Sequence, residues 1–169
     1  MATISYDATI QGAARRADSF GPNAAKDKFR GTYYSVLVHW FPTSRGYIID
    51  HQVLGPAGKK VEYIVTRNEG GFHNPLLIIN LKRPSEWTAA GQQMVVDELV
   101  GHIKDHFNLT RYNTIYGLGG IGLQWMVCKI QRSGDHQPIV LVNWKDNIAS
   151  DASYAEFAVI ADLIYSLVD

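Results

Sequence analysis

The stretch Leu76-Leu77-Ile78-Ile79-Asn80-Leu81-Lys82 decides how this chain is expected to fold. It is apolar almost without interruption, which is typical of a central strand that is buried on both faces of a sheet, and Pro84 predicts its end. Successive side chains of a strand point to opposite faces, so Asn80 and Lys82 are expected on one face and Leu81 on the other. The end of this strand therefore carries a polar pair that requires an explanation.

The segments around this strand alternate between patterns typical of helices and of strands. Helices are predicted where apolar residues recur at helical spacing, and strands where short β-rich runs end at glycine or proline turns. A C-terminal helix is expected from Ser153, which has capping-box spacing to Glu156. The other expected elements are a helix over 23–41, strands over 47–53, 61–66 and 76–82, a helix over 87–107, and strands over 114–118, 123–131 and 138–144.

This order of elements predicts the fold class and the domain organisation. A chain of 169 residues is about the size of one ordinary domain, and it contains no internal repeat. We expect a single α/β (α+β) domain over residues 22–169, with a central mixed β-sheet flanked by amphipathic helices. Residues 1–21 show weak periodicity and many small residues, and are expected to form an N-terminal arm or a short helix.

Composition excludes several classes of protein. Sixteen Lys and Arg balance sixteen Asp and Glu, so a nucleic-acid partner would have to meet a local basic patch. No apolar run approaches the roughly 18–20 residues of a membrane span, and no secretory signal is recognisable, so no membrane partner is expected. Cys128 is the single cysteine, which excludes an internal disulfide and favours a reducing compartment. The expected location is cytoplasmic.

Three short motifs are better explained by structure than by chemistry. The segment Gly117–Gly122 matches G-x-G-x-x-G, but strand-forming residues follow it instead of a helix, so a flexible corner of the sheet is predicted. His102 and His106 lie four apart on a predicted helix, but a zinc site needs a third ligand, so two surface histidines are expected. Cys128 lies within a strand among apolar neighbours and is expected to be a buried, inert thiol.

A further constellation combines the polar end of the central strand with Glu62 on the strand before it. If the two strands are adjacent, Glu62, Asn80 and Lys82 bring an acid, an amide and an ammonium group to one face of the sheet. A buried lysine needs a partner for its charge, so Glu62 could serve only as a counter-ion. The residues themselves leave the structural and the functional interpretation open.

The same residues resemble a known superfamily. A short acidic strand, an apolar strand ending in (D/E)-x-K and a helix that carries glutamine are the layout of PD-(D/E)xK, restriction-endonuclease-like nucleases. The stretch Leu77–Pro84 resembles the ΦΦΦExKxP strand, and Gln92-Gln93-Met94 resembles the helix glutamine. Lys28–Tyr34 and the strand pair around Tyr116-Gly117-Leu118 further resemble a group of small fungal proteins of this type. The resemblance covers about residues 26–132 and implies a restriction-endonuclease-like fold.

The resemblance also implies a catalytic site. In that superfamily two acids bind Mg²⁺ and the lysine orients or activates water, which carries over to Glu62, Asn80 and Lys82, with Gln93 on the next helix. Hard Mg²⁺ prefers negatively charged oxygen ligands, and phosphodiester cleavage needs charge stabilisation at the leaving oxygen. The sequence departs from the pattern because Glu62 replaces the usual Asp and Asn80 replaces an acid. Asp50 is a candidate to replace the lost metal ligand.

Three functions follow from these considerations. The first is a nuclease-fold protein that acts on or binds DNA or RNA, with a degenerate Mg²⁺-dependent phosphodiesterase site. The second is a fully active Mg²⁺-dependent nuclease that recruits Asp50. The third is a non-enzymatic interaction or defence protein that kept the fold. Whether the protein is an enzyme stays open at this point, and a homo-oligomer is compatible with the sequence.

Overall fold

The computed structural model describes residues 4–168, which form four α-helices, six strands and short 3₁₀ turns. Most element boundaries lie within a few residues of those expected from the sequence. The helices are α1 (Ala8–Asp18), α2 (Arg30–Trp40), α3 (Ala89–His106) and α4 (Asp151–Val168), and the strands are β1 (Tyr47–Leu54), β2 (Lys60–Glu69), β3 (Phe72–Lys82), β4 (Thr114–Ile121), β5 (Gln124–Gln131) and β6 (Ile139–Lys145).

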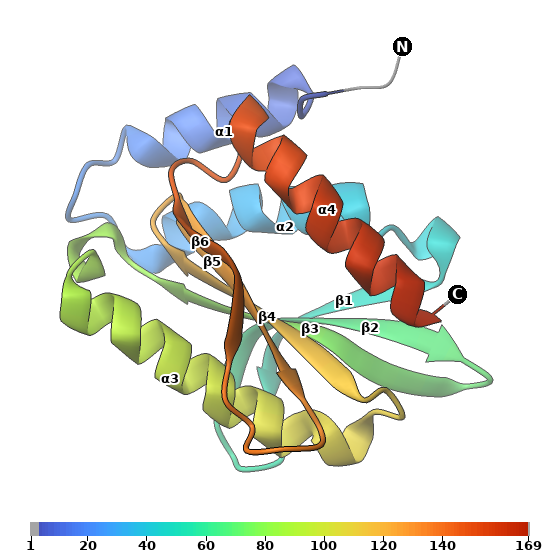
Figure 1. Cartoon of the computed structure of the whole chain (residues 1–169). Coiled ribbons are helices and arrows are strands. Elements are labelled where there is room, and N and C mark those ends of the chain that lie inside the picture. Colours follow the sequence, from blue (N-terminus) through green and yellow to red (C-terminus); the bar gives the residue numbers. More distant parts are fainter. Residues whose placement is uncertain (1–3, 169) are drawn as a thin grey trace.

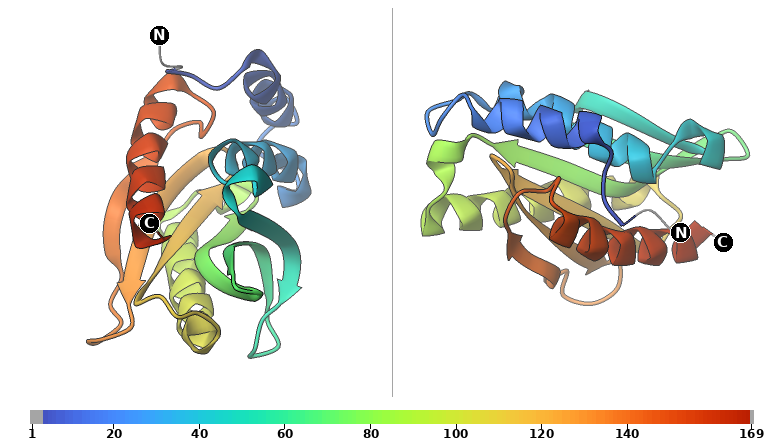
Figure 2. Two further views of the ribbon diagram at one scale, coloured as in Figure 1. Left: turned by 90° about the vertical axis from the view of Figure 1, so that its right-hand side faces the viewer. Right: turned by 90° about the horizontal axis from the view of Figure 1, so that it is seen from above.

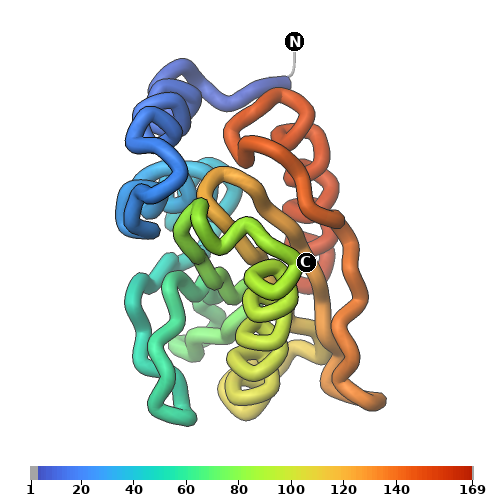
Figure 3. The backbone as a smooth tube through the Cα atoms, turned by 90° about the vertical axis from the view of Figure 1, so that its left-hand side faces the viewer, coloured from blue at the N-terminus to red at the C-terminus, as the bar shows by residue number. Residues whose placement is uncertain are grey.

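The six strands form one mixed sheet in which spatial order follows sequence order (Figure 1). The β3–β4 pair is parallel and the other four pairs are antiparallel. Parallel neighbours need a crossover connection, and α3 supplies it. Figure 3 shows the β1–β2 hairpin and the β5–β6 hairpin at opposite edges of the sheet.

Helices cover both faces of the sheet, and each face has its own apolar core. Residues of α1, α2 and α4 join one core, whereas α3 contributes Val95, Leu99 and Ile103 to the other. Figure 2 shows the α1–α2 pair and α4 over the same side of the sheet. Within β3, Ile79 belongs to the first core and Ile78 to the second, as alternation requires. The single α/β domain with a central mixed sheet is confirmed.

The N-terminal segment, for which an arm or a short helix was expected, contains the helix α1. Asp7 caps this helix by accepting a hydrogen bond of 3.0 Å from the backbone N–H of Ile10. Ile10, Ala14 and Ala17 are buried in the core on the α2 side of the sheet. Helix α1 therefore contributes apolar surface to the same core as the later elements.

Strand β3 begins at Phe72, four residues before the predicted start at Leu76. Proline disfavours the interior of a strand because it cannot donate to the ladder. Pro75 is accommodated opposite Thr66, where the register with β2 shifts between Val65 and Thr66. The extra residue is Leu76 of β3 itself, because β2 advances by one residue while β3 advances by two, and this bulge lets the strand extend past the proline.

The glycine-rich segment is not a flexible corner, and that expectation is wrong. Gly117, Gly119 and Gly120 lie inside β4, and the turn comes at Gly122, whose φ of 57° is left-handed. A Cβ atom at Gly119 would lie 2.4 Å from Cγ1 of Val95 on α3. Glycine is required here because helices on both faces approach the strand closely.

Two further expectations need correction. Ser153 lies inside α4, and the hydroxyl oxygen of Ser150 accepts from the Ser153 backbone N–H at 3.1 Å, so the helix is capped three residues earlier than predicted. His102 and His106 are buried instead of exposed, because α3 turns both toward the protein. His106 Nδ1 donates to the His102 carbonyl oxygen at 2.6 Å.

Cys128 is buried in β5, as expected, and burial raises the pKa of its thiol to about 12. The thiol is therefore protonated and unreactive near neutral pH. Within residues 4–168, no helix is both long and apolar enough to cross a membrane.

Candidate functional site

The polar end of β3 forms a cluster with one carboxylate of α3. Asn80 Nδ2 donates to Glu98 Oε2 at 2.7 Å, and Lys82 Nζ lies 3.0 Å from Glu98 Oε1. Leu81 points to the opposite core, so the expected alternation of these three residues is confirmed. The partner of the pair is a residue that the sequence analysis did not select.

The packing of α3 places Glu98 over the end of β3. Val95 and Leu99 are fully buried against the sheet, and Glu98 lies beside this apolar stripe on the helix surface. The helix follows β3 through a short 3₁₀ turn, and Glu98, near its middle, contacts the strand end. The available signal in the sequence was an acid next to the apolar stripe of the crossover helix, which is common on helices and therefore not specific.

Opposing effects act on the pKa of Glu98. Partial burial raises the pKa, but hydrogen bonds from Asn80 and Lys82, together with the positive charge of Lys82, outweigh burial and lower it below the ordinary value. The carboxylate is therefore ionised at neutral pH and neutralises Lys82.

Glu62 is buried near the same end of the sheet, but it has other partners. Its Oε2 lies 3.3 Å from Lys26 Nζ, and its Oε1 accepts a hydrogen bond from Arg30 Nε. Both cations belong to the segment that starts α2, on the face opposite α3. Glu62 is thus the counter-ion of Lys26 and Arg30, and among residues 4–168 no ion pair joins it to Lys82.

The strand positions of Glu62 and Asn80 are nevertheless adjacent. Strand β2 pairs with β3, as expected, and the last ladder pair joins Tyr63 to Ile79. Because the strands are antiparallel, the next position on each strand is Glu62 and Asn80. The sequence therefore brings the two backbones together, while their side chains are held by different helices.

The side chains diverge where the pairing of β1 with β2 is locally irregular. Val61 belongs to the core beneath α3, whereas Tyr63 belongs to the core beneath α2, so strict alternation is interrupted at Glu62. The residue opposite Glu62 is Gln52, which has a left-handed φ of 52°. The expected single-face cluster of Glu62, Asn80 and Lys82 is not formed for this reason.

Gln93 and Asp50 lie outside this cluster. Gln93 is exposed on α3 and donates to Asp97 Oδ1 at 2.8 Å. Asp50 is exposed on the edge strand β1, opposite Ile64, and lines a cavity with His73 and His106. No hydrogen bond or ion pair of the described chain joins either residue to Asn80 or Lys82.

The donor set does not fit a resident Mg²⁺ ion. Mg²⁺ is usually bound through carboxylate oxygens, which must be free to face the ion. Glu62 and Glu98 each accept from cationic side chains, and Asn80 supplies only an amide. Residues 4–168 contain no group of three or more His, Cys, Asp or Glu side chains arranged to hold a metal.

Comparison with known proteins supports the fold. No family model matches the sequence, and no curated protein matches it. Among solved structures, the chain is similar to a chain in the cryo-EM structure of the DrdV–DNA complex, with a TM-score of 0.54, 12% sequence identity and coverage of 92% of each chain. At this identity the similarity shows the fold alone, and it supports the single α/β domain with a central mixed sheet that the sequence predicted.

The lowered pKa of Glu98 predicts a pH dependence. The folded state binds a proton at the Glu98 carboxyl less tightly than the unfolded state does. The cluster therefore stabilises the folded protein at pH values above the ordinary carboxyl pKa. This stabilisation is lost as the pH falls through the lower pKa of the folded state. An NMR titration of the Glu98 side-chain carboxyl carbon is expected to show a midpoint below the ordinary value. In Lys82→Met, which keeps the length but removes the charge, the midpoint should rise. An unchanged midpoint would contradict the assigned ion pair.

Proposed function

We propose that this protein is a nuclease-fold protein that binds nucleic acid, and that its Mg²⁺-dependent phosphodiesterase site is degenerate. The observation that carries the proposal is that both carboxylates near the end of the central strands, Glu62 and Glu98, are already paired with cationic side chains. Glu98 neutralises Lys82, and Glu62 neutralises Lys26 and Arg30. The end of the sheet keeps the lysine and one acid of a nuclease layout, with Asn80 in place of the other acid, and Glu62 and Glu98 are each neutralised by cationic side chains.

The same cations support nucleic-acid binding. The side chains of Lys26, Arg30 and Lys82 are 47%, 31% and 25% exposed, so phosphate groups can reach them. A phosphodiester that displaces Glu62 or Glu98 would keep these cations neutralised, and counter-ion release would make binding salt-dependent. The fold similarity to a chain of a DNA complex favours the same interpretation.

Binding and cleavage by the native protein test the two parts of the proposal separately. Fluorescence anisotropy with single- and double-stranded DNA and RNA should show binding that weakens with increasing salt. Cleavage of the same substrates should be slow or absent with Mg²⁺, and equal to the rate with chelator. Rapid Mg²⁺-dependent cleavage that Lys82→Ala abolishes would support the fully active alternative instead.

Restoring the missing acid is expected to create metal affinity. In Asn80→Glu a second carboxylate would lie beside Glu98, so the two acids could share a divalent ion. We expect Mg²⁺ affinity to rise about tenfold or more by calorimetry, and Mg²⁺-dependent cleavage to appear or increase. Asn80→Gln is the matched control, because it adds the same length without the charge.

The outcomes of this experiment separate the hypotheses. A gain in Asn80→Glu but not in Asn80→Gln supports a degenerate phosphodiesterase site. If neither variant gains metal affinity and the native protein binds no nucleic acid, the fold has been kept for a non-enzymatic interaction. If the native protein cleaves rapidly and Lys82→Ala leaves the rate unchanged, the proposed site is wrong.

A further inference from the structure

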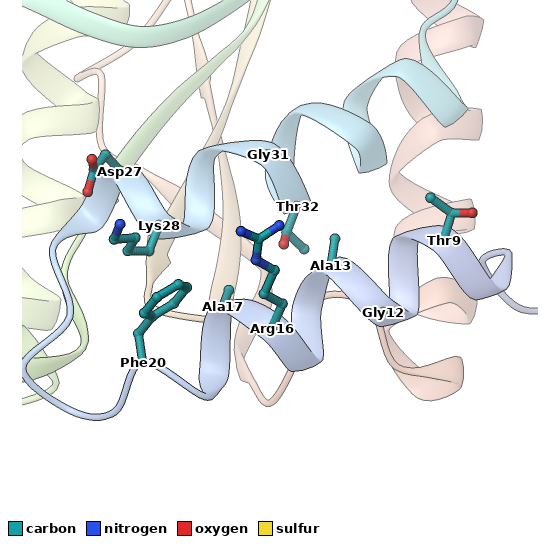
Figure 4. A pocket seen from close by; sticks show the side chains of 10 residues that line it. All are labelled: Thr9, Gly12, Ala13, Arg16, Ala17, Phe20, Asp27, Lys28, Gly31 and Thr32. Carbon is teal, nitrogen blue, oxygen red and sulfur yellow. The ribbon is translucent and has the colours of Figure 1, made fainter.

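An open groove lies between α1 and α2, and no residue of the candidate site lines it (Figure 4). Its volume is about 440 Å³, which is in the range of small-ligand sites in proteins. Small residues line its walls, namely Gly12, Ala13, Ala17 and Gly31. The absence of bulky side chains at these positions keeps the space between the helices open.

Two cations reach this groove from opposite helices. Arg16 comes from α1 and Lys28 from the turn that leads into α2. Within residues 4–168 neither side chain forms an ion pair with an acid. Asp27 also lines the groove, but in Figure 4 its carboxylate points away from Arg16. The groove therefore offers two positive charges that can bind an anion.

An aromatic ring completes the arrangement. Phe20 is 47% exposed, and the Lys28 ammonium lies 4.8 Å from the centroid of its ring. An exposed aromatic side chain next to cations is the combination that binds single-stranded nucleic acid, because unpaired bases stack on the ring while the cations contact phosphates. A duplex offers no unpaired base for this ring.

We infer that this groove binds single-stranded nucleic acid, with a base against Phe20 and the backbone phosphates at Arg16 and Lys28. The inference rests on the proposed nucleic-acid binding and specifies where and in what form the strand is held. The segment that carries Lys28 into the groove also carries Lys26 and Arg30 toward Glu62. The groove thus adjoins the segment whose cations pair with Glu62 on β2.

Gly31 allows a sharp test of the groove. It lies in α2, and a Cβ atom added there would meet no other atom within 4 Å. Replacing a helical glycine favours the helix, so a side chain can be added at this position without unfolding the protein. Gly31→Glu places a negative charge in the groove, and Gly31→Gln places a side chain of the same shape without charge.

The measurement is fluorescence anisotropy with a labelled oligothymidylate of about 15 nucleotides, a length within the range of single-strand sites. We expect Gly31→Glu to weaken binding about tenfold, which corresponds to about 1.4 kcal/mol, and Gly31→Gln to stay within about twofold of the native protein. Equal affinity for the two variants would overturn the inference, since the charge would then be irrelevant.

Removal of the contacting side chains gives a second measurement. Phe20→Ala is expected to weaken binding about tenfold through lost stacking, whereas Arg16→Ala and Lys28→Ala should each reduce the salt slope by about one. Lys104→Ala, an exposed lysine on α3, is the control and should change neither quantity.

Failure of this inference can be distinguished from failure of the proposed function. If the native protein binds nucleic acid but the groove variants keep its affinity and salt slope, the groove inference alone is overturned. If duplex DNA binds as tightly as the single strand and responds equally to Gly31→Glu, the assignment to single strands is wrong. If the native protein binds no nucleic acid at all, the proposed function and the inference both fail.

Discussion

Trp125→Ala is expected to lower the free energy of unfolding by roughly 3–5 kcal/mol, as truncation of a large buried aromatic side chain does. Trp125 is fully buried in β5, and its ring centroid lies 5.6 Å from that of Phe157 on α4. Its indole N–H donates to Ser153 Oγ at 2.9 Å. The substitution would leave a cavity between the sheet and α4. It would also remove the indole N–H that donates to the buried Ser153 hydroxyl oxygen.

Denaturant unfolding of the variant measures this loss, and a second tryptophan provides the control. Trp87 is 38% exposed and contacts Trp144 edge to face, with 5.3 Å between the ring centroids. Because less of its surface is buried, Trp87→Ala should cost no more than about 1–2 kcal/mol. A loss below about 1 kcal/mol in Trp125→Ala would contradict the observed packing of α4 on the sheet.

Gly120→Val is expected to destabilise the protein by about 3 kcal/mol through overpacking. A Cβ atom at Gly120 would lie 2.5 Å from the Tyr33 hydroxyl oxygen and 2.7 Å from Leu81 Cδ2. Tyr33 cannot easily move, because it is fully buried and its hydroxyl donates to the Gly122 carbonyl oxygen at 2.8 Å. The added side chain would therefore break this hydrogen bond or push α2 away from β4.

A glycine with free space supplies the matched control for this prediction. Gly101 lies in α3, and a Cβ atom there would meet nothing within 4 Å. Gly101→Ala should therefore stabilise the protein by up to about 1 kcal/mol through helix propensity. Thermal or denaturant unfolding of both variants measures the difference, and similar stability of the two would show that β4 tolerates side chains at Gly120.

The sequence by itself determined the architecture where the signal is local. The apolar run of β3 predicted a central strand, and the apolar stripe of α3 predicted a helix over 87–107. These patterns are reliable because burial of one face imposes a period on the chain that can be read from neighbouring residues. The placement of Asn80 and Lys82 on one face followed from the same alternation.

Local reasoning was less successful where packing from several elements decides the outcome. The glycines of β4 lie within a regular strand. Glycine is needed at these positions because Val95 approaches from one face and Tyr33 from the other. His102 and His106 were expected on the surface, but α3 and its surroundings bury them. Neither result has a sequence signal within a few residues of the positions concerned.

The candidate site shows most clearly what the sequence determines and what the packing of distant elements determines. The sequence predicted that β2 and β3 are adjacent and that Glu62 and Asn80 lie at the same end. Only the tertiary structure decided which charges meet, since α3 brings Glu98 to Lys82, and Glu62, at the irregularity opposite Gln52, pairs with Arg30. A charged side chain pairs with whatever opposite charge the packed helices bring within reach, and that choice depends on contacts between residues far apart in the chain.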